Sequence, residues 1–220
     1  MKSLTTLFSL VFLTAWCHAE SDDFNAATVD AGKWSADLVT GHGALSQTNQ
    51  QLEFLIDGTA TAFDQSVRPW KPSRGPYNAD WEVQVDTLNS LAPTGTTNQQ
   101  IAAGITIDDA RGIVSNEVIA VQVSGTAFAP QPYVGFMGRL GAPDTGTFAS
   151  ALNLPITNGA VRVAFNSTTK VITLYYDTNP TNGYTWTQFA AFGVNGAGGT
   201  DANMDWGMTD ADQFKIGVYG

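Results

Sequence analysis

The chain has 220 residues, of which 43% are hydrophobic, and its formal net charge at pH 7 is −10. Nucleic acids and anionic membranes attract basic surfaces, so this charge argues against both as general partners. The single cysteine, Cys17, lies near the N-terminus, which leaves the rest of the chain without a disulfide, a thiol nucleophile or a thiolate metal site.

Residues 1–19 have the pattern of a secretory signal peptide. Lys2 is followed by the apolar run LTTLFSLVFLTAW, and the segment CHA ends at Ala19. The apolar run is shorter than the roughly 20 residues that a transmembrane helix needs, so we expect no membrane span. We expect cleavage near Ala19, a bacterial secreted or periplasmic protein, and a single domain over residues 20–220.

No later segment shows sustained helical periodicity. Short runs of β-branched and aromatic residues are separated by clusters of Gly, Pro, Asn and Asp, which is typical of strands joined by turns. The pattern predicts an all-β domain, a two-sheet antiparallel jelly-roll sandwich, with its clearest hairpin turning at Asn166 to Lys170. We expect strands at residues 51–57, 61–67, 80–88, 101–108, 117–123, 133–140, 160–166, 170–177, 185–193 and 213–220.

Several motifs follow one another along residues 22–220, namely DDFN, LEF, DWEVQVD, AAGITIDD, VRVAFNSTTKVITLYYDTN and FKIGVYG. In this order they resemble the concanavalin A-like lectin/glucanase superfamily, and more narrowly the laminin-G-like domains of bacterial secreted proteins. The resemblance implies two packed antiparallel sheets, one of them concave, often with carbohydrate on the concave face or at its rim. Such domains usually have a further strand after the segment GVYG, so the chain as it stands predicts an exposed sheet edge.

The segment DWEVQVD, residues 80–86, places Glu82, Gln84 and Asp86 on one face of a predicted strand and apolar residues on the other. Glucanases of the resembled superfamily have E-x-D-x-E or E-x-D-x-x-E on one strand, so that two carboxylates flank the bond to be cut. Here an amide replaces the middle acid and the last acid is a shorter aspartate. These departures favour a solvated strand face, while a glycoside hydrolase that uses Glu82 and Asp86 is the alternative.

The segment RPWKPSRGPY, residues 68–77, predicts a stiff, basic and aromatic loop because it contains three prolines and a glycine. Trp70 could stack on a sugar ring while Arg74 binds a carboxylate or sulfate. Alternatively, the cations of the loop stack on Trp70 and Tyr77 and only order the loop. Trp70, Arg74 and Tyr77 are the predicted ligand contacts.

The segment DANMDWGMTDAD, residues 201–212, has oxygen-bearing side chains at positions 1, 3, 5 and 12 of a calcium-loop template. Asp201, Asn203, Asp205 and Asp212 would hold a structural Ca²⁺. The glycine lies one place late, at Gly207, and the closing residue is aspartate instead of a bidentate glutamate. An acidic surface loop is therefore the alternative interpretation.

Together these features predict a secreted, lectin-like domain that binds a polysaccharide or glycan without cleaving it. The sequence has no intact pair of glucanase acids, which favours binding over catalysis. Two alternatives remain open, a glucanase-type hydrolase and a structural or adhesion module that binds protein.

Overall fold

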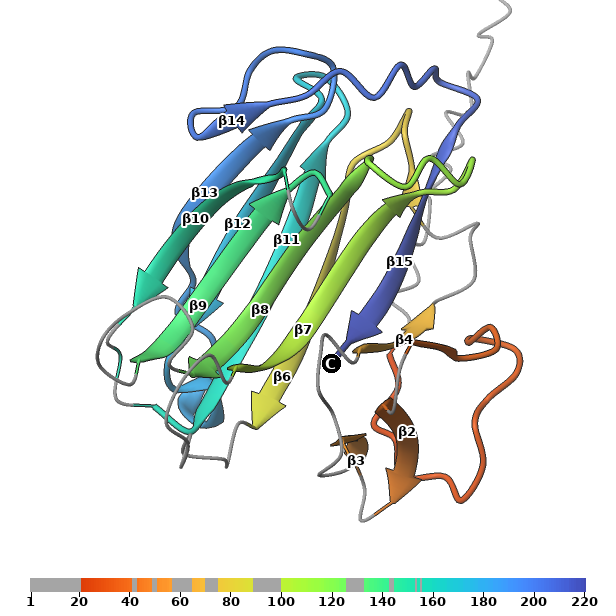
Figure 1. Cartoon of the computed structure of the whole chain (residues 1–220), viewed down its shortest axis with the longest axis vertical. Helices are drawn as coiled ribbons and strands as arrows, with labels where there is room; N and C mark the ends of the chain where they lie inside the picture. Colours follow the sequence, from red (N-terminus) through yellow and green to blue (C-terminus); the bar gives the residue numbers. More distant parts are fainter. Residues whose placement is uncertain are drawn as a thin grey trace, which may run out of the picture.

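The computed structural model describes residues 21–40, 43–48, 51–56, 65–69, 75–88, 100–125, 133–142, 145–152, 154 and 156–220 (Figure 1). In these residues the chain is all-β, as predicted, and its helical structure is one 3-10 turn, η2 (Pro180–Asn182). Within the described part of the chain, no helix is long and apolar enough to cross a membrane.

The larger sheet has eight strands, and its neighbouring strands are antiparallel. The spatial order along it is β1, β4, β15, β7, β8, β9 and β10, with β5 paired to β15. The strands are β1 (Leu38–Thr40), β4 (Gln65–Pro69), β5 (Gly75–Pro76), β7 (Gln100–Asp109), β8 (Glu117–Gly125), β9 (Tyr133–Leu140), β10 (Thr147–Leu152) and β15 (Gln213–Tyr219).

The second sheet has five strands in the order β14, β13, β12, β11 and β6, all antiparallel except the short parallel pairing of β14 with β13. The predicted hairpin of residues 159–177 is confirmed, because the Lys170 N–H donates to the Asn166 carbonyl across the turn. The strands are β6 (Trp81–Leu88), β11 (Asn158–Asn166), β12 (Val171–Asp177), β13 (Thr187–Gly193) and β14 (Ala202–Asn203). A separate hairpin pairs β2 (Gly43–Thr48) with β3 (Gln51–Ile56).

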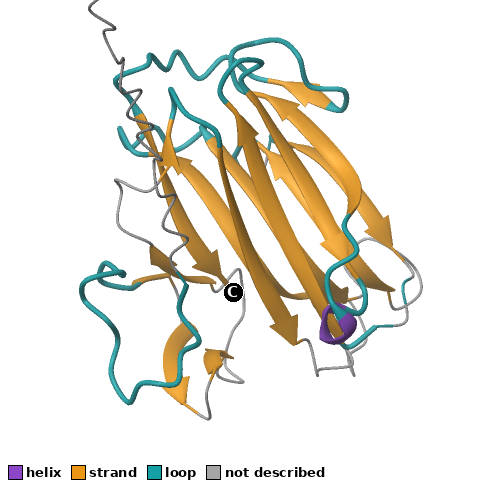
Figure 2. Ribbon diagram, turned by 180° about the vertical axis from the view of Figure 1, so that it is seen from behind, coloured by secondary structure: helices purple, strands orange, loops and turns teal. Residues whose placement is uncertain are grey.

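The two larger sheets lie face to face and enclose one hydrophobic core, an arrangement consistent with a β-sandwich (Figure 2). Phe214 on β15 lies inside an aromatic cluster, with ring centroids 4.8 Å from Phe165 and 5.3 Å from Trp81. Gly138 on β9 allows the sheets to approach closely, since a Cβ at this position would lie 2.4 Å from a Leu174 methyl group.

The last strand, β15, is an interior strand. It pairs with β4 and β5 on one side and with β7 on the other. The sequence predicts an exposed sheet edge beside the segment GVYG. For β15 this prediction is wrong, because β4 and β5 pair with the side of β15 that β7 leaves open. Among the described strands, β6 ends the row of the five-stranded sheet.

Candidate functional site

The outward face of the five-stranded sheet carries the row of polar residues that the sequence predicts on β6. Exposed and half-buried residues alternate along this strand, so Glu82, Gln84 and Asp86 face outward while Trp81 and its alternate neighbours face the core. The side-chain periodicity of a strand therefore produces an acid, an amide and an acid on one surface. This part of the prediction is confirmed.

Strands β11 and β12 extend this surface with an arginine and a tyrosine. Arg162 lies opposite Gln84 on one side and opposite Tyr175 on the other. Its guanidinium forms an ion pair with Glu82 at 3.3 Å and lies 4.9 Å from the centroid of the Tyr175 ring. Arg162 occupies an outward position because its neighbours in the sequence, both valines, point into the core.

The connection between β12 and β13 folds back against the same surface. The buried Asp177 carboxylate holds the connection in place, because it accepts hydrogen bonds from the backbone N–H groups of Asn179 (2.6 Å) and Thr185. The connection contains Tyr184 and Trp186, whose rings stack 5.0 Å apart at an angle of 8°. The two rings thus form one stacked pair, which we call the aromatic platform.

This platform contacts the polar row of β6. The Tyr184 hydroxyl donates a hydrogen bond of 2.9 Å to Asp86, and the Trp186 ring lies 5.6 Å from the Arg162 guanidinium. Burial, followed by the adjacent Asp86 carboxylate, raises the pKa of the Tyr184 hydroxyl. Even so, Tyr184 is 44% exposed, so part of the platform is open to solvent.

The polar row, Arg162, Tyr175 and Tyr184 line a groove of about 2020 Å³ that follows the edge strand β6. The lining also includes Trp34 and Phe54 of the N-terminal region, and Trp186 joins the site through its stacking with Tyr184. Exposed aromatic rings beside carboxylate, amide and guanidinium groups can stack on the C–H face of a pyranose and hydrogen-bond its hydroxyls. We call the residues Glu82, Gln84, Asp86, Arg162, Tyr175, Tyr184 and Trp186 the β6 site.

The predicted hydrolase residues belong to this site but have separate partners. Glu82 pairs with Arg162, whereas Asp86 accepts its hydrogen bond from Tyr184. Glu82 and Asp86 lie four residues apart on one strand, which places their Cα atoms about 13 Å apart. Retaining and inverting hydrolases need carboxyl groups about 5 to 9.5 Å apart, so both side chains would have to leave these partners and lean toward each other.

The structure describes one of the three ligand contacts predicted in residues 68–77, namely Tyr77. Trp70 and Arg74 lie outside the described residues. Tyr77 is 3% exposed and belongs to the core, where its ring centroid lies 5.6 Å from that of Phe165 and 3.9 Å from the Lys170 ammonium. The expectation that Tyr77 contacts a ligand is therefore corrected, since core residues already cover its ring.

The four predicted calcium ligands lie on β14 and in the segments before and after it, where each side chain has its own local partner. In the described part of the chain, no three His, Cys, Asp or Glu residues gather closely enough to hold a metal ion. Each of the four accepts a hydrogen bond from a different backbone N–H, at 2.7 or 2.8 Å: Asp201 from Ala191, Asn203 from Gly199, Asp205 from Gly207, and Asp212 from Thr209.

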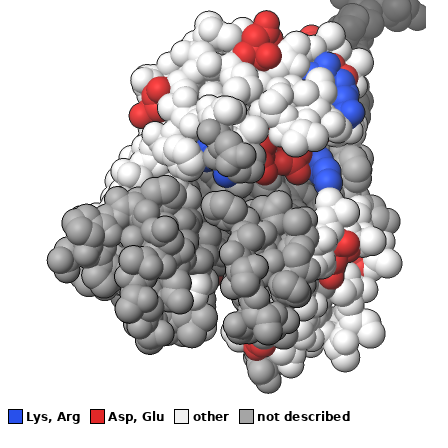
Figure 3. Space-filling view, viewed as in Figure 1, with Lys and Arg blue, Asp and Glu red and all other residues white. Residues whose placement is uncertain are grey.

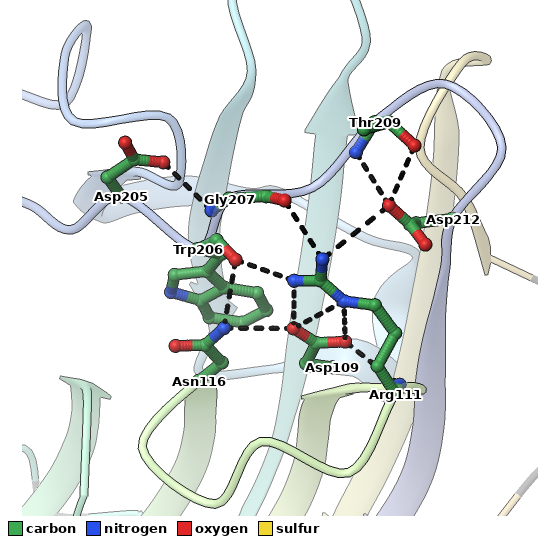
Figure 4. Close-up of polar contacts among 8 residues, drawn as sticks. All are labelled: Asp109, Arg111, Asn116, Asp205, Trp206, Gly207, Thr209 and Asp212. Atoms are coloured by element: carbon green, nitrogen blue, oxygen red, sulfur yellow. Dashed lines mark hydrogen bonds and ion pairs between the residues drawn. The ribbon is translucent and has the colours of Figure 1, made fainter.

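An arginine supplies positive charge to part of this loop (Figure 4). The Arg111 guanidinium, from the turn after β7, donates to the carbonyl oxygens of Trp206 (2.6 Å) and Gly207 (2.9 Å) and lies 3.7 Å from the Asp212 carboxylate. Backbone carbonyl and carboxylate oxygens are also the groups that coordinate calcium in proteins. The acidic spacing thus has a structural role that involves Arg111, and calcium at the four residues stays a prediction.

Asp109, at the end of β7, fixes the orientation of Arg111. Its buried carboxylate accepts hydrogen bonds from the Arg111 guanidinium (2.6 and 2.9 Å) and from the Asn116 amide (2.9 Å). Burial disfavours the charged form of Asp109, but the hydrogen bonds from Arg111 and Asn116 outweigh it, so the pKa of Asp109 is lowered. This network joins the β7–β8 turn to the loop before β15.

A second group of charges crosses the outward face of the larger sheet, where acidic and basic side chains lie next to one another (Figure 3). Asp108 on β7 lies opposite both Lys215 on β15 and Glu117 on β8, and Glu117 forms an ion pair with Arg139 on β9. Burial and the neighbouring Glu117 raise the pKa of Asp108 to about 6. The two acids and two bases balance in formal charge, so we interpret the row as a cross-strand structural network.

Sequence reasoning missed Arg162, Tyr175 and Tyr184 as members of the β6 site. A signal was present, because Arg162 interrupts the apolar alternation of β11 and must face away from the core. No comparable signal indicates that Tyr184, in a turn-rich connection, reaches Asp86. Comparison with family models and with curated proteins gives no match for this chain.

Proposed function

We propose that this chain is an exported carbohydrate-binding domain that binds a polysaccharide or glycan at the β6 site without cleaving it. In this proposal the sandwich has the jelly-roll topology of the concanavalin A-like superfamily, in keeping with the motif order of the sequence. The observation that carries the proposal is the stacked and partly exposed pair Tyr184 and Trp186, which lies beside Asp86 and Arg162.

The chemistry of the β6 site suits a sugar. A pyranose presents a C–H face to an aromatic ring and a rim of hydroxyl groups to polar side chains. Asp86 and Glu82 offer acceptors, and the Gln84 amide offers both a donor and an acceptor. Residues 80 to 88 all line the groove along β6. This length of strand is enough for several sugar units of an extended polysaccharide to lie along it.

Native affinity electrophoresis tests the proposal on the full chain. Gels would contain neutral β-glucans, xylan, alginate or a sulfated galactan, each with calcium and with chelator, and the polysaccharide would be checked for shortening. We expect retardation in at least one gel with no shortening. Unchanged mobility in every gel would refute carbohydrate binding, whereas shortening that Glu82→Gln abolishes would favour the hydrolase.

Tyr184→Ala locates the site. Truncating an aromatic contact in the centre of a binding surface costs more than about 1.4 kcal/mol, so we expect retention at least about tenfold weaker. The matched control is Phe148→Ala, which truncates another exposed ring, on β10 of the larger sheet, and should bind like the unmodified chain. Equal binding by Tyr184→Ala would place the contact away from the β6 site.

A further inference from the structure

The formal charge of the β6 site is negative. Glu82, whose side chain is 62% exposed, and the exposed Asp86 face the same groove. The whole chain, these acids included, has a formal net charge of −10 at pH 7. A ligand at this surface therefore meets a negative potential from both the site and the protein.

The cation of the β6 site is already engaged. Of the described Lys and Arg residues, Arg162 is the one that lines the groove. Its guanidinium is held by the ion pair with Glu82 and by the Tyr175 and Trp186 rings, its side chain is 25% exposed, and its Nε is buried. A carboxylate or sulfate on a ligand would have to compete with Glu82 for this group, and the displaced Glu82 would then be left without its partner.

We infer that the β6 site selects neutral, hydroxyl-rich glycans and discriminates against glycans that carry carboxylate or sulfate groups. This inference rests on the proposed carbohydrate binding and defines its ligand class. Hydroxyl groups donate hydrogen bonds to the carboxylates of Glu82 and Asp86, and charge-assisted bonds of this kind are stronger than neutral ones. An anionic substituent cannot donate such a bond and is repelled by the same two side chains.

The test compares neutral and anionic forms of one backbone. Two pairs are suitable, hydroxyethylcellulose with carboxymethylcellulose, and agarose with chemically sulfated agarose, in affinity gels at about 10 mM and 500 mM salt. The Debye length falls from about 30 Å to about 4 Å between these conditions, so the repulsion should act mainly at low salt. At low salt we expect the anionic member to bind about fivefold to tenfold more weakly than its neutral partner, and the difference to shrink at high salt.

Paired variants separate the local effect from the net charge. Glu82→Gln with Asp86→Asn removes both acids of the β6 site and should reduce the neutral-to-anionic ratio at least about threefold. The control, Asp30→Asn with Asp210→Asn, removes two exposed charges that do not line the groove and should leave the ratio closer to that of the unmodified chain.

The outcomes distinguish this inference from the proposed function. Retention by both members of a pair to the same degree, or tighter retention by the anionic member, would overturn the charge selectivity while carbohydrate binding stands. An equal change of the ratio in the two double variants would show that net charge, and not the β6 site, sets the preference, and would also overturn the inference. Absence of retention by any polysaccharide would refute both.

Discussion

Replacing Asp109 with alanine tests the polar network that joins the β7–β8 turn to the loop before β15. The Asp109 carboxylate, whose side chain is 0% exposed, accepts from the backbone N–H and the guanidinium of Arg111 and from the Asn116 amide. The substitution removes all of these hydrogen bonds. It leaves Asn116 with the Trp206 carbonyl at 3.3 Å, and it leaves Arg111 beside two carbonyl groups and Asp212.

The cost follows from the burial of the two partners. Breaking a buried ion pair from one side costs about 3 to 5 kcal/mol. The Arg111 side chain is 32% exposed and can recover water, so we expect the lower end, a loss of about 3 kcal/mol in the free energy of unfolding. For a chain of this size such a loss lowers the melting temperature by roughly 6 to 12 °C.

Urea unfolding followed by tryptophan fluorescence measures the effect, because Trp206 is buried and contacts the network. The control Asp210→Ala removes a carboxylate from the same loop whose side chain is 78% exposed, and should change the stability by less than about 1 kcal/mol. A loss of less than about 1 kcal/mol in Asp109→Ala would refute the reasoning, since an ordinary surface ion pair contributes that much.

The pH dependence of the same difference gives an independent check. The pKa of Asp109 is lowered in the folded chain, so its contribution is complete above the unfolded pKa of about 4 and is lost as the pH falls through the lower folded value. The stability difference between the unmodified chain and Asp109→Ala should therefore be constant from pH 7 to about 5 and shrink below about 4. A difference that grows on acidification would contradict this sign.

Two further changes test other parts of the sandwich. Asp108→Asn should stabilise the chain at pH 7.5, because the pKa of Asp108 is raised to about 6 in the folded state. This gain should vanish below about pH 4, where the carboxyl group is protonated in both the folded and the unfolded state. A gain that stays constant in urea titrations over this pH range would contradict the raised pKa. Phe214→Ala should cost about 3 to 5 kcal/mol, because it removes a fully buried ring from the aromatic cluster, and a urea midpoint close to that of the unmodified chain would show that the cluster does not support the core.

Local patterns predicted the long strands well. Each predicted strand overlaps an observed one, and residues 133–140 match β9 at both ends. For residues 61–67 the overlap begins at Gln65, because residues 61–64 lie outside the described part of the chain. Long strands are readable because their alternate residues must fill the core, and this requirement appears directly in the sequence.

The sequence did not predict strands β1, β2, β5, β10 and β14, and two of these, β10 and β14, show why. Strand β10 (TFASAL) contains small and polar residues and is mostly exposed or half-buried, so tertiary pairing with β9 decides its conformation. Strand β14 has two residues and lies in the segment predicted to bind calcium. There the sequence shows oxygen-bearing side chains at a suggestive spacing, but it cannot show whether their partners are a metal ion or nearby N–H groups.

The 201–212 loop and the β6 site share one physical feature. In each, an arginine from a distant part of the sequence forms an ion pair with an acidic residue. Arg111 reaches the loop from the turn after β7, 96 positions before Gly207, and Arg162 reaches Glu82 from the neighbouring strand β11. A rigid planar donor can satisfy several oxygens at once, but in doing so it loses the freedom to bind an added anion. In an acidic chain, the described arginines of these two sites therefore serve as internal counter-ions, which leaves aromatic faces and hydroxyl-accepting carboxylates as the groups that can meet a ligand.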